Sequence, residues 1–370
     1  MLLTKRAAFR SAAGIGLTVL LLAGLLAGCG GAADKGGETK PSAGNNTGPA
    51  PITQTPDDNG AADKTEPEQK PAYTAPLTGL PSVREVTNRP FAVMVNNLKP
   101  ARPQSGLPHA DIVWEVLAEG GITRLVAIFQ SDEFTDPIGP IRSIRPYLIQ
   151  IGESYGGILV HSGASNDALA LLQHSGKADM DEINNAGAYF YRDKSRKAPH
   201  NLYSTLDKLK EGAAKKKYDK AVTVPALPFA VEGATGGGKP ATNVDIQFLL
   251  KDYKVSYAYD PATKLYARSI NGEPHTDLTT KTQLTTTNIA VIGAKHRTYD
   301  DYGRLDIDLD SGGPAVLIQL GKAVECEWKR GTDGAVHLMK DGKELPMVPG
   351  KTYYHIVPMT PTFAEHIKYS

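Results

Sequence analysis

Apolar residues recur along the chain in short runs, and the spacing of these runs predicts two folded regions. In the first region, residues 111–117 and 122–130 are rich in β-branched and other apolar side chains, and Ala-Glu-Gly-Gly at 118–121 is typical of a turn. Two such runs around a short glycine-containing turn predict a β-hairpin.

Helical spacing follows the predicted hairpin. Apolar positions between 145 and 155 predict one helix, and a second begins with Ser165 or Asn166 as its N-cap and ends at Gly176. The run 157–161 between them predicts a short buried strand. Strand, helix, strand and helix in this order indicate a βαβ unit. We therefore expect residues 77–220 to form an α/β or α+β domain with a partly parallel sheet.

The pattern changes beyond residue 220. Residues 221–241 are rich in proline and glycine and predict a linker. Short β-type runs separated by turns such as Asn271-Gly272 then follow at 253–259, 265–270, 288–292, 304–309, 315–320, 324–328, 336–339 and 353–357. Residues 242–358 are therefore expected to form a β-rich domain, either a sandwich or a barrel-like fold.

The first residues have the pattern of an export signal. A basic start and an apolar stretch at 12–26 lead into Leu-Ala-Gly-Cys at 26–29. This predicts a secretory signal peptide over 1–28, because the stretch is shorter than the ~20 apolar residues of a membrane span. It resembles the bacterial lipobox, which implies that Cys29 carries a diacylglyceryl group after cleavage. The alternative is an ordinary signal peptide with a chance cysteine.

Residues 29–76 almost lack large apolar side chains. Such a segment cannot bury enough surface to offset its ordering entropy, so we expect a lipidated, disordered linker. It would tether the folded part to the extracytoplasmic face of the bacterial cell membrane.

Charge and cysteine content narrow the functional classes. The chain has 41 basic and 40 acidic residues, and removal of 1–28 takes three basic and no acidic residues, which leaves 38 against 40. This balance argues against a nucleic-acid partner. With Cys29 lipidated, Cys326 is the only remaining cysteine, so no intrachain disulfide is expected. A buried structural thiol is the favoured interpretation of Cys326.

Several segments together resemble one protein family. They are RPFAVMVNN at 89–97, RPQSGL at 102–107, ADIVWE at 110–115, AEGGITR at 118–124, IGPIRSIRP at 138–146, HSG at 161–163, APHNLY at 198–203, YAR at 266–268, GEPHTD at 272–277 and PGKTY at 349–353. This set is similar to the YerB-type lipoproteins, a family described as a domain of unknown function with separate N- and C-terminal domains. The resemblance implies a fold and the cellular location of a lipoprotein. It does not imply an activity.

The candidate binding site rests on two loops that are expected to meet. One follows the strand ending near Gln130 and contains Arg142 and Arg145, and the other follows His161 and reaches Ser165 at a helix start. If the two strands are parallel, both loops lie at the edge of the sheet where ligands bind. Guanidinium groups and helix N–H groups there would bind a carboxylate or phosphate. The alternative is that the arginines pair with acidic side chains and only fix the loops.

Arg124 and His200 complete the candidate ligand-binding set in the first region. His200 could join His161 as an acid/base or metal pair, but a hydrogen-bonded strut is the commoner role of a histidine in a loop. Glu115 and Glu119 could form a carboxylate pair as in glycosidases. We favour a solvated strand edge, or a partner for Arg124, as their role.

Candidates in the second region are Arg268, His275 and Asp277. His275 and Asp277 are two residues apart and share a face if the backbone is extended, where they could hold a metal or a substrate. A turn-stabilising role is favoured, because Asn271-Gly272 is a hairpin signal. We expect no metal site and no cofactor.

Two functional classes remain. The favoured one is a cell-envelope binding or assembly protein that recognises an anionic ligand, such as a cell-wall component, or an envelope protein partner. The other is an envelope hydrolase or transferase that acts on an anionic wall polymer through Arg142, Arg145, His161 and His200. The sequence contains no HExxH motif, which is typical of zinc hydrolases.

Overall fold

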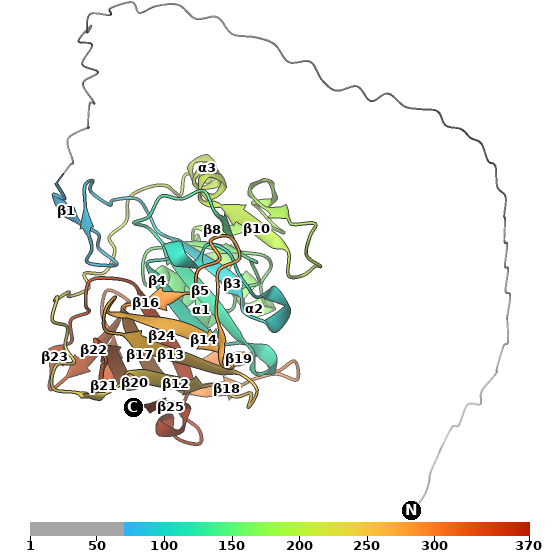
Figure 1. Cartoon of the computed structure of the whole chain (residues 1–370). Coiled ribbons are helices and arrows are strands. Elements are labelled where there is room, and N and C mark those ends of the chain that lie inside the picture. Colours follow the sequence, from blue (N-terminus) through green and yellow to red (C-terminus); the bar gives the residue numbers. More distant parts are fainter. Residues whose placement is uncertain (1–69) are drawn as a thin grey trace, which may run out of the picture. The chain divides into compact units, whose positions relative to one another are not determined.

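β-strands dominate the computed structural model, which describes residues 70–370 (Figure 1). The predicted signal peptide at 1–28 and the predicted linker up to residue 69 lie outside the described residues. None of the helices within 70–370 is long and apolar enough to span a membrane.

A twelve-stranded mixed sheet forms the centre of the fold, in the order β23-β22-β21-β20-β17-β24-β4-β5-β3-β7-β8, with β11 paired to β21. Its strands are β3 (Phe91–Asn96), β4 (Ile112–Leu117), β5 (Thr123–Phe129), β7 (Ile158–His161), β8 (Asp179–Asp181), β11 (Lys239–Pro240), β17 (Asn288–Ala294), β20 (Gly313–Gln319), β21 (Lys322–Arg330), β22 (Val336–Lys340), β23 (Lys343–Glu344) and β24 (Thr352–Pro358). The predicted hairpin is β4 and β5, which pair antiparallel.

The first region has the predicted partly parallel sheet, but its topology differs from the predicted βαβ unit. β7 pairs in parallel with β3 and β8, whereas β3 pairs antiparallel with β5. β3 therefore lies between the strand that ends near Gln130 and the strand 157–161, and these two strands are neither neighbours nor parallel. The prediction that they form a parallel pair is wrong, because it overlooked β3.

β24 joins the two sequence regions in one sheet. It lies between β4 of the first region and β17 of the second, and pairs in parallel with both. Residues 70–370 accordingly belong to one compact unit. The division into domains at 221–241 stays a prediction.

A second, six-stranded sheet contains strands from the second region, in the order β15-β14-β13-β12-β25 with β16 paired to β14. Its strands are β12 (Asn243–Gln247), β13 (Lys254–Asp260), β14 (Leu265–Ile270), β15 (Glu273–Pro274), β16 (Thr285–Thr286) and β25 (Ile367–Tyr369). It packs against the central sheet, as the ring of Tyr257 lies 5.6 Å from that of His355 and 6.4 Å from that of Tyr353. The second region is thus β-rich, as predicted.

The remaining elements are short. Two-residue strands β1 (Tyr73–Thr74) and β2 (Pro81–Ser82) pair with each other, β6 (Pro137–Ile138) and β9 (Tyr191–Arg192) flank β10 (Leu202–Thr205), and β18 (His296–Thr298) pairs with β19 (Leu305–Ile307). The α-helices are α1 (Pro146–Glu153), α2 (Asn166–Ser175) and α3 (Leu206–Lys216), and single 3₁₀ turns lie at Lys99–Ala101, Leu107–His109, Glu119–Gly121, Gly187–Tyr189 and Phe363–His366.

Alternate side chains of the central strands enter two cores. Ala92 and Met94 of β3 pack in one core with α1, while Val93 and Val95 pack in the other with α3. This follows from the two-residue period of a strand, which sends successive side chains to opposite faces. The central strands β3, β4 and β5 are therefore covered on both faces, with all of their residues buried.

Candidate functional site

Arg124, Arg142 and Arg145 gather with Glu119 at one end of β3, β4 and β5, and we call these four residues the edge cluster. Arg124 opens β5 and lies opposite Asn96, the last residue of β3, in the strand register. The loop that carries Arg142 returns to the same end, since the Arg142 N–H donates to the Met94 carbonyl at 2.8 Å. The arginines thus meet at the end of β3.

The three guanidinium groups of the edge cluster differ in their partners. Arg145 pairs with Glu119 and donates to the Ile144 carbonyl at 2.8 Å, and Arg124 donates to the Ser143 carbonyl at 2.7 Å. Arg142 is half-buried and makes no side-chain hydrogen bond or ion pair with any residue from 70 to 370. The sequence left open that both arginines pair with acidic side chains and only fix the loops. Arg145 has such a partner, and Arg142 has none among the described residues.

The arginines of the edge cluster repel one another. Burial, reinforced by the charges of Arg145 and Arg142, lowers the pKa of Arg124 to about 10. Burial and the charge of Arg145 also lower the pKa of Arg142. Glu119 is the carboxylate whose attraction opposes these effects. Three positive groups around one negative group are an arrangement that favours an anion.

The loop after His161 does lie beside the arginine loop, through backbone contacts. Ser162 N–H donates to the Arg142 carbonyl at 3.1 Å, and Ile144 N–H donates to the Gly163 carbonyl at 3.0 Å. The His161 ring, however, is fully buried, with Nδ1 3.0 Å from the Gly163 carbonyl and Nε2 3.6 Å from Asp179. Ser165 is the N-cap of α2 and is also buried. Neither side chain is exposed beside Arg142.

His200 approaches the edge cluster from another loop. Its Nδ1 lies 2.8 Å from the Asn96 amide nitrogen. Burial and the nearby charges of Arg142 and Arg196 lower the pKa of His200, which favours the neutral ring at neutral pH. No hydrogen bond or ion pair in the described part of the chain joins His200 to His161, whose ring lies against Asp179 and Asp181.

A second polar group lies inside the molecule, where β4 and β24 meet the six-stranded sheet. Glu115, Arg268 and His355 are each fully buried. Arg268 Nη2 lies 2.7 Å from Glu115 Oε2, and Nδ1 of His355 lies 3.2 Å from the same oxygen. The expectation that Glu115 is a solvated edge or a partner for Arg124 is therefore wrong, since its side chain points into the protein interior and pairs with Arg268.

Neutral partners complete this group, which we call the seam network. Its members are Asn97, Gln104, Glu115, Thr123, Tyr253, Tyr257, Arg268, His275 and His355. Arg268 donates to Tyr257 Oη at 2.7 Å and to His275 Nδ1 at 2.9 Å, so His275 must donate through Nε2–H, to Gln104 Oε1 at 2.7 Å. Each member of the network thus has a hydrogen-bond partner within it.

Charge in the seam network is balanced. Burial opposes ionisation of Glu115, but the charge of Arg268 and contacts with His355 and Tyr253 outweigh it and hold the pKa of this carboxyl well below its usual range. Burial and the charge of Arg268 lower the pKa of His275 far enough that its ring is neutral. The network thus contains one anion, Glu115, and one cation, Arg268.

The candidates of the second region contribute unequally to the seam. Arg268 and His275 are members of the seam network, whereas Asp277 accepts hydrogen bonds from the N–H groups of Thr279 and Gly106, both at 2.8 Å. Asp277 therefore stabilises its own turn and attaches it to the loop of the first region.

The sequence interpretation missed six members of the seam network, Asn97, Gln104, Thr123, Tyr253, Tyr257 and His355. Six of the family-like segments each place one residue in this network, namely those at 89–97, 102–107, 110–115, 118–124, 266–268 and 272–277. A polar residue within an otherwise apolar buried strand, such as Glu115 in β4, was the signal that could have indicated it.

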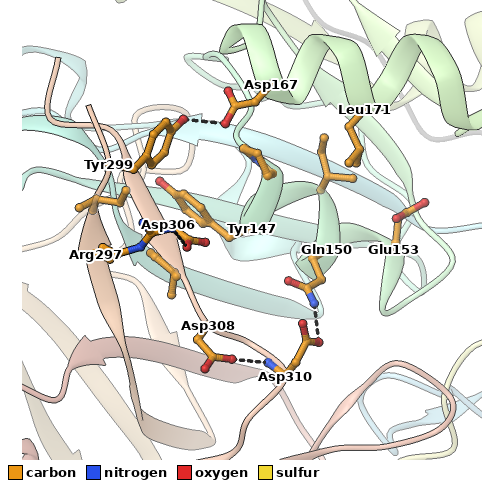
Figure 2. A pocket seen from close by; sticks show the side chains of 14 residues that line it. Tyr147, Gln150, Glu153, Asp167, Leu171, Arg297, Tyr299, Asp306, Asp308 and Asp310 are labelled. Atoms are coloured by element: carbon orange, nitrogen blue, oxygen red, sulfur yellow. Dashed lines mark hydrogen bonds and ion pairs between the residues drawn. The ribbon is translucent and has the colours of Figure 1, made fainter. Parts of the chain in front are cut away.

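A groove of about 780 Å³ lies between α1 and α2 on one side and β18 and β19 on the other (Figure 2). Its acidic residues already have partners. Tyr299 donates to Asp167, Gln150 to Asp310, Arg297 to Asp306, the Asp310 N–H to Asp308, and Lys177 to Glu153. Among residues 70–370, no group of three or more His, Cys, Asp or Glu side chains could hold a metal ion. We therefore do not take this groove as the site.

Comparisons with known proteins agree with this fold. A family model described as "Protein of unknown function (DUF3048) N-terminal domain" matches residues 77–219, and the DUF3048 C-terminal domain matches residues 244–354. A Bacillus subtilis (strain 168) protein named "Putative lipoprotein YerB" is 42% identical over 299 residues, which cover 79% of this chain and 88% of that protein.

A crystal structure of the YerB protein from Bacillus subtilis is also similar. It has a TM-score of 0.74 and 39% sequence identity, and the match covers 80% of this chain and 99% of the crystallised chain. The two family matches and this relative span the described fold, so the chain belongs to the YerB-type family, whose members carry the two DUF3048 domains.

Proposed function

We propose that this chain is a lipid-anchored binding protein of the cell envelope, and that its edge cluster recognises an anionic group of an envelope component. The proposal rests on one observation. Arg142 is a half-buried guanidinium without a partner among residues 70–370, beside two further arginines and a single carboxylate.

Electrostatics explains why an unpartnered arginine beside two others favours the binding of an anion. A guanidinium that has lost part of its water and faces like charges gains most from an incoming anion, because the anion replaces lost hydration and relieves repulsion. Carboxylate and phosphate oxygens fit the planar fork of arginine in two parallel hydrogen bonds. Within the edge cluster, Glu119, Arg142 and Arg145 are partly exposed to solvent, whereas Arg124 is buried.

Anchoring is inferred from the sequence and from the relative's name. Leu-Ala-Gly-Cys at 26–29 resembles a lipobox, and the Bacillus subtilis relative is named a lipoprotein. Replacement C29S should abolish lipid labelling and release the protein from membranes. Membrane fractionation of this variant at the wild-type level would contradict the anchor.

Ligand binding can be tested with the mature C29S chain and two arginine variants. R142Q removes the unpartnered guanidinium, and R84Q is a matched control because Arg84 is exposed and lies outside the edge cluster. The probes are pyrophosphate, followed by calorimetry, and purified peptidoglycan with or without its attached phosphate polymer, followed by co-sedimentation.

Wild type and R84Q should bind equally, and R142Q should bind at least about tenfold more weakly, since hydrogen bonds to charged groups contribute about 1.5–3 kcal/mol. Binding should also weaken as salt is raised. Equal binding by R142Q and wild type would refute the edge cluster as the site.

The alternative function, an envelope hydrolase or transferase, needs an acid/base pair beside the arginines. His161 is enclosed in the core and His200 is held by Asn96, without a contact between the two histidines in the described residues. We therefore argue for binding rather than for catalysis.

A further inference from the structure

A groove borders the seam network, and Arg102 lines both of its parts. Two cavities, of about 360 and 270 Å³, share Lys99, Arg102 and Asn271 in their walls. The first continues along Pro274 and His275, and the second along Asn97 and Tyr253. Together they have the size of a small-ligand site.

The seam network positions Arg102 from below. Tyr253 bonds to Glu115 through its hydroxyl, and its ring lies under the guanidinium, with 5.5 Å between Arg102 Cζ and the ring centroid. From the other side, Arg196 donates to the carbonyls of Pro103 at 3.0 Å and Arg102 at 3.2 Å. These contacts therefore hold the backbone at Arg102 and the ring of Tyr253 in place without a ligand.

Arg102 nevertheless lacks an anion. Its Nε is buried and has no hydrogen-bond acceptor among residues 70–370, and no carboxylate in that part of the chain pairs with it. Glu115 is already bound to Arg268. Burial lowers the pKa of Arg102, as expected for a cation that has lost water without gaining a partner.

The walls of the groove also carry negative groups. Asp252 lines the second cavity and Glu273 the first, and both are exposed. Neither forms an ion pair with Lys99 or Arg102 in the described residues. A ligand that pairs both with Arg102 and with one of these carboxylates must itself carry a negative and a positive charge.

We propose that this groove, which we call the seam groove, binds a short peptide with a free carboxylate on Arg102 and an ammonium group facing Asp252 or Glu273. A peptide chain can extend along both cavities, whose walls share Lys99, Arg102 and Asn271, and it carries charges of both signs. This site is separate from the edge cluster and does not depend on the anion binding proposed there.

The test uses the mature C29S chain and the zwitterionic pentapeptide Ala-Glu-Lys-Ala-Ala, with binding followed by calorimetry. R102Q should bind the peptide at least about tenfold more weakly than wild type, since a charge-assisted hydrogen bond is lost. Amidation of the peptide's C-terminus should weaken wild-type binding by a similar factor, and R84Q should bind like wild type.

A second variant guards against a folding effect of R102Q. Lys99 is exposed, so K99Q leaves the core unchanged and should weaken binding severalfold. Absence of wild-type binding at millimolar peptide, equal affinity of R102Q and wild type, or no effect of amidation would each overturn the proposal. Loss of peptide binding in R142Q with normal binding in R102Q would assign the peptide to the edge cluster and refute the seam groove alone.

Discussion

The seam network and the edge cluster are both built around arginines, yet they handle charge in opposite ways. In the seam network the fully buried Arg268 has one carboxylate, Glu115, at 2.7 Å, and neutral donors and acceptors complete the group. In the edge cluster three arginines lie near a single carboxylate, Glu119, which forms an ion pair with Arg145 alone among the described residues. If the edge cluster binds an anion as proposed, charge balance distinguishes a polar group that fixes the fold from one that binds a ligand.

The largest effect is expected from breaking the seam network. E115Q leaves Arg268 buried without an anion, so the free energy of unfolding should fall by about 3–5 kcal/mol. Urea denaturation followed by circular dichroism measures this change. A loss below about 1 kcal/mol would mean that water reaches the pair and that the network is not closed.

A double variant separates the charge from the packing. Because R268M removes the cation that E115Q leaves unpaired, E115Q/R268M should be more stable than the two single changes predict by at least about 1 kcal/mol. The same denaturation experiment on the four proteins gives this coupling. Strict additivity would show that Glu115 and Arg268 do not act as a pair.

His275 of the seam network predicts a pH dependence of stability that the edge arginines cannot produce. Since the pKa of His275 is lowered in the folded state, the unfolded chain binds more protons below about pH 6.5, and stability contributed by the neutral ring is lost as the pH falls. Between pH 6.5 and 5, the free energy of unfolding should fall more steeply with decreasing pH in wild type than in H275Q. The difference in slope should be up to about 1.4 kcal/mol per pH unit.

The pH comparison is made between two proteins because other histidines titrate in the opposite sense. Hydrogen bonding to Asp132 raises the pKa of His109, so that group stabilises the fold on acidification. This effect is the same in wild type and H275Q and cancels in the difference. Identical slopes would show that His275 is not held neutral.

The smallest effect is expected at the edge cluster. R142Q should change the free energy of unfolding by no more than about 0.5 kcal/mol, because the side chain has no partner to lose and its removal relieves repulsion. E119Q, which leaves three arginines without their carboxylate, should lower it by about 1 kcal/mol. A larger loss for R142Q than for E119Q would make Arg142 a structural strut.

Much of the fold could be predicted from local patterns. Alternation and turns predicted the hairpin of β4 and β5 and most of the longer strands of the second region, including β14 at its observed bounds, residues 265–270. β3 was missed, although all six of its residues are buried. A strand covered on both faces has no polar alternation, so the usual period is lost.

The candidate site could be predicted only in part. Arg142 and the loop after His161 do meet, but through the intermediate strand β3 and not through the parallel pair that was expected. The His161 ring lies against Asp179 and Asp181 of β8, and no local pattern predicts that β8 pairs with β7. The pairing of Glu115 with Arg268 joins residues 153 positions apart, and spacing along the chain gives no signal for it.

The position of β24 has a consequence for how the protein is made. This strand, Thr352–Pro358, separates β4 from β17, so the first region cannot finish its sheet until the end of the chain is available. As the polypeptide emerges N-terminus first from the ribosome or a translocation channel, β4 waits with an open edge through the synthesis of more than two hundred further residues. Open strand edges are templates for aggregation, so we expect a chain that stops before β24 to be prone to aggregation and proteolysis, which would make β24 a checkpoint for complete synthesis.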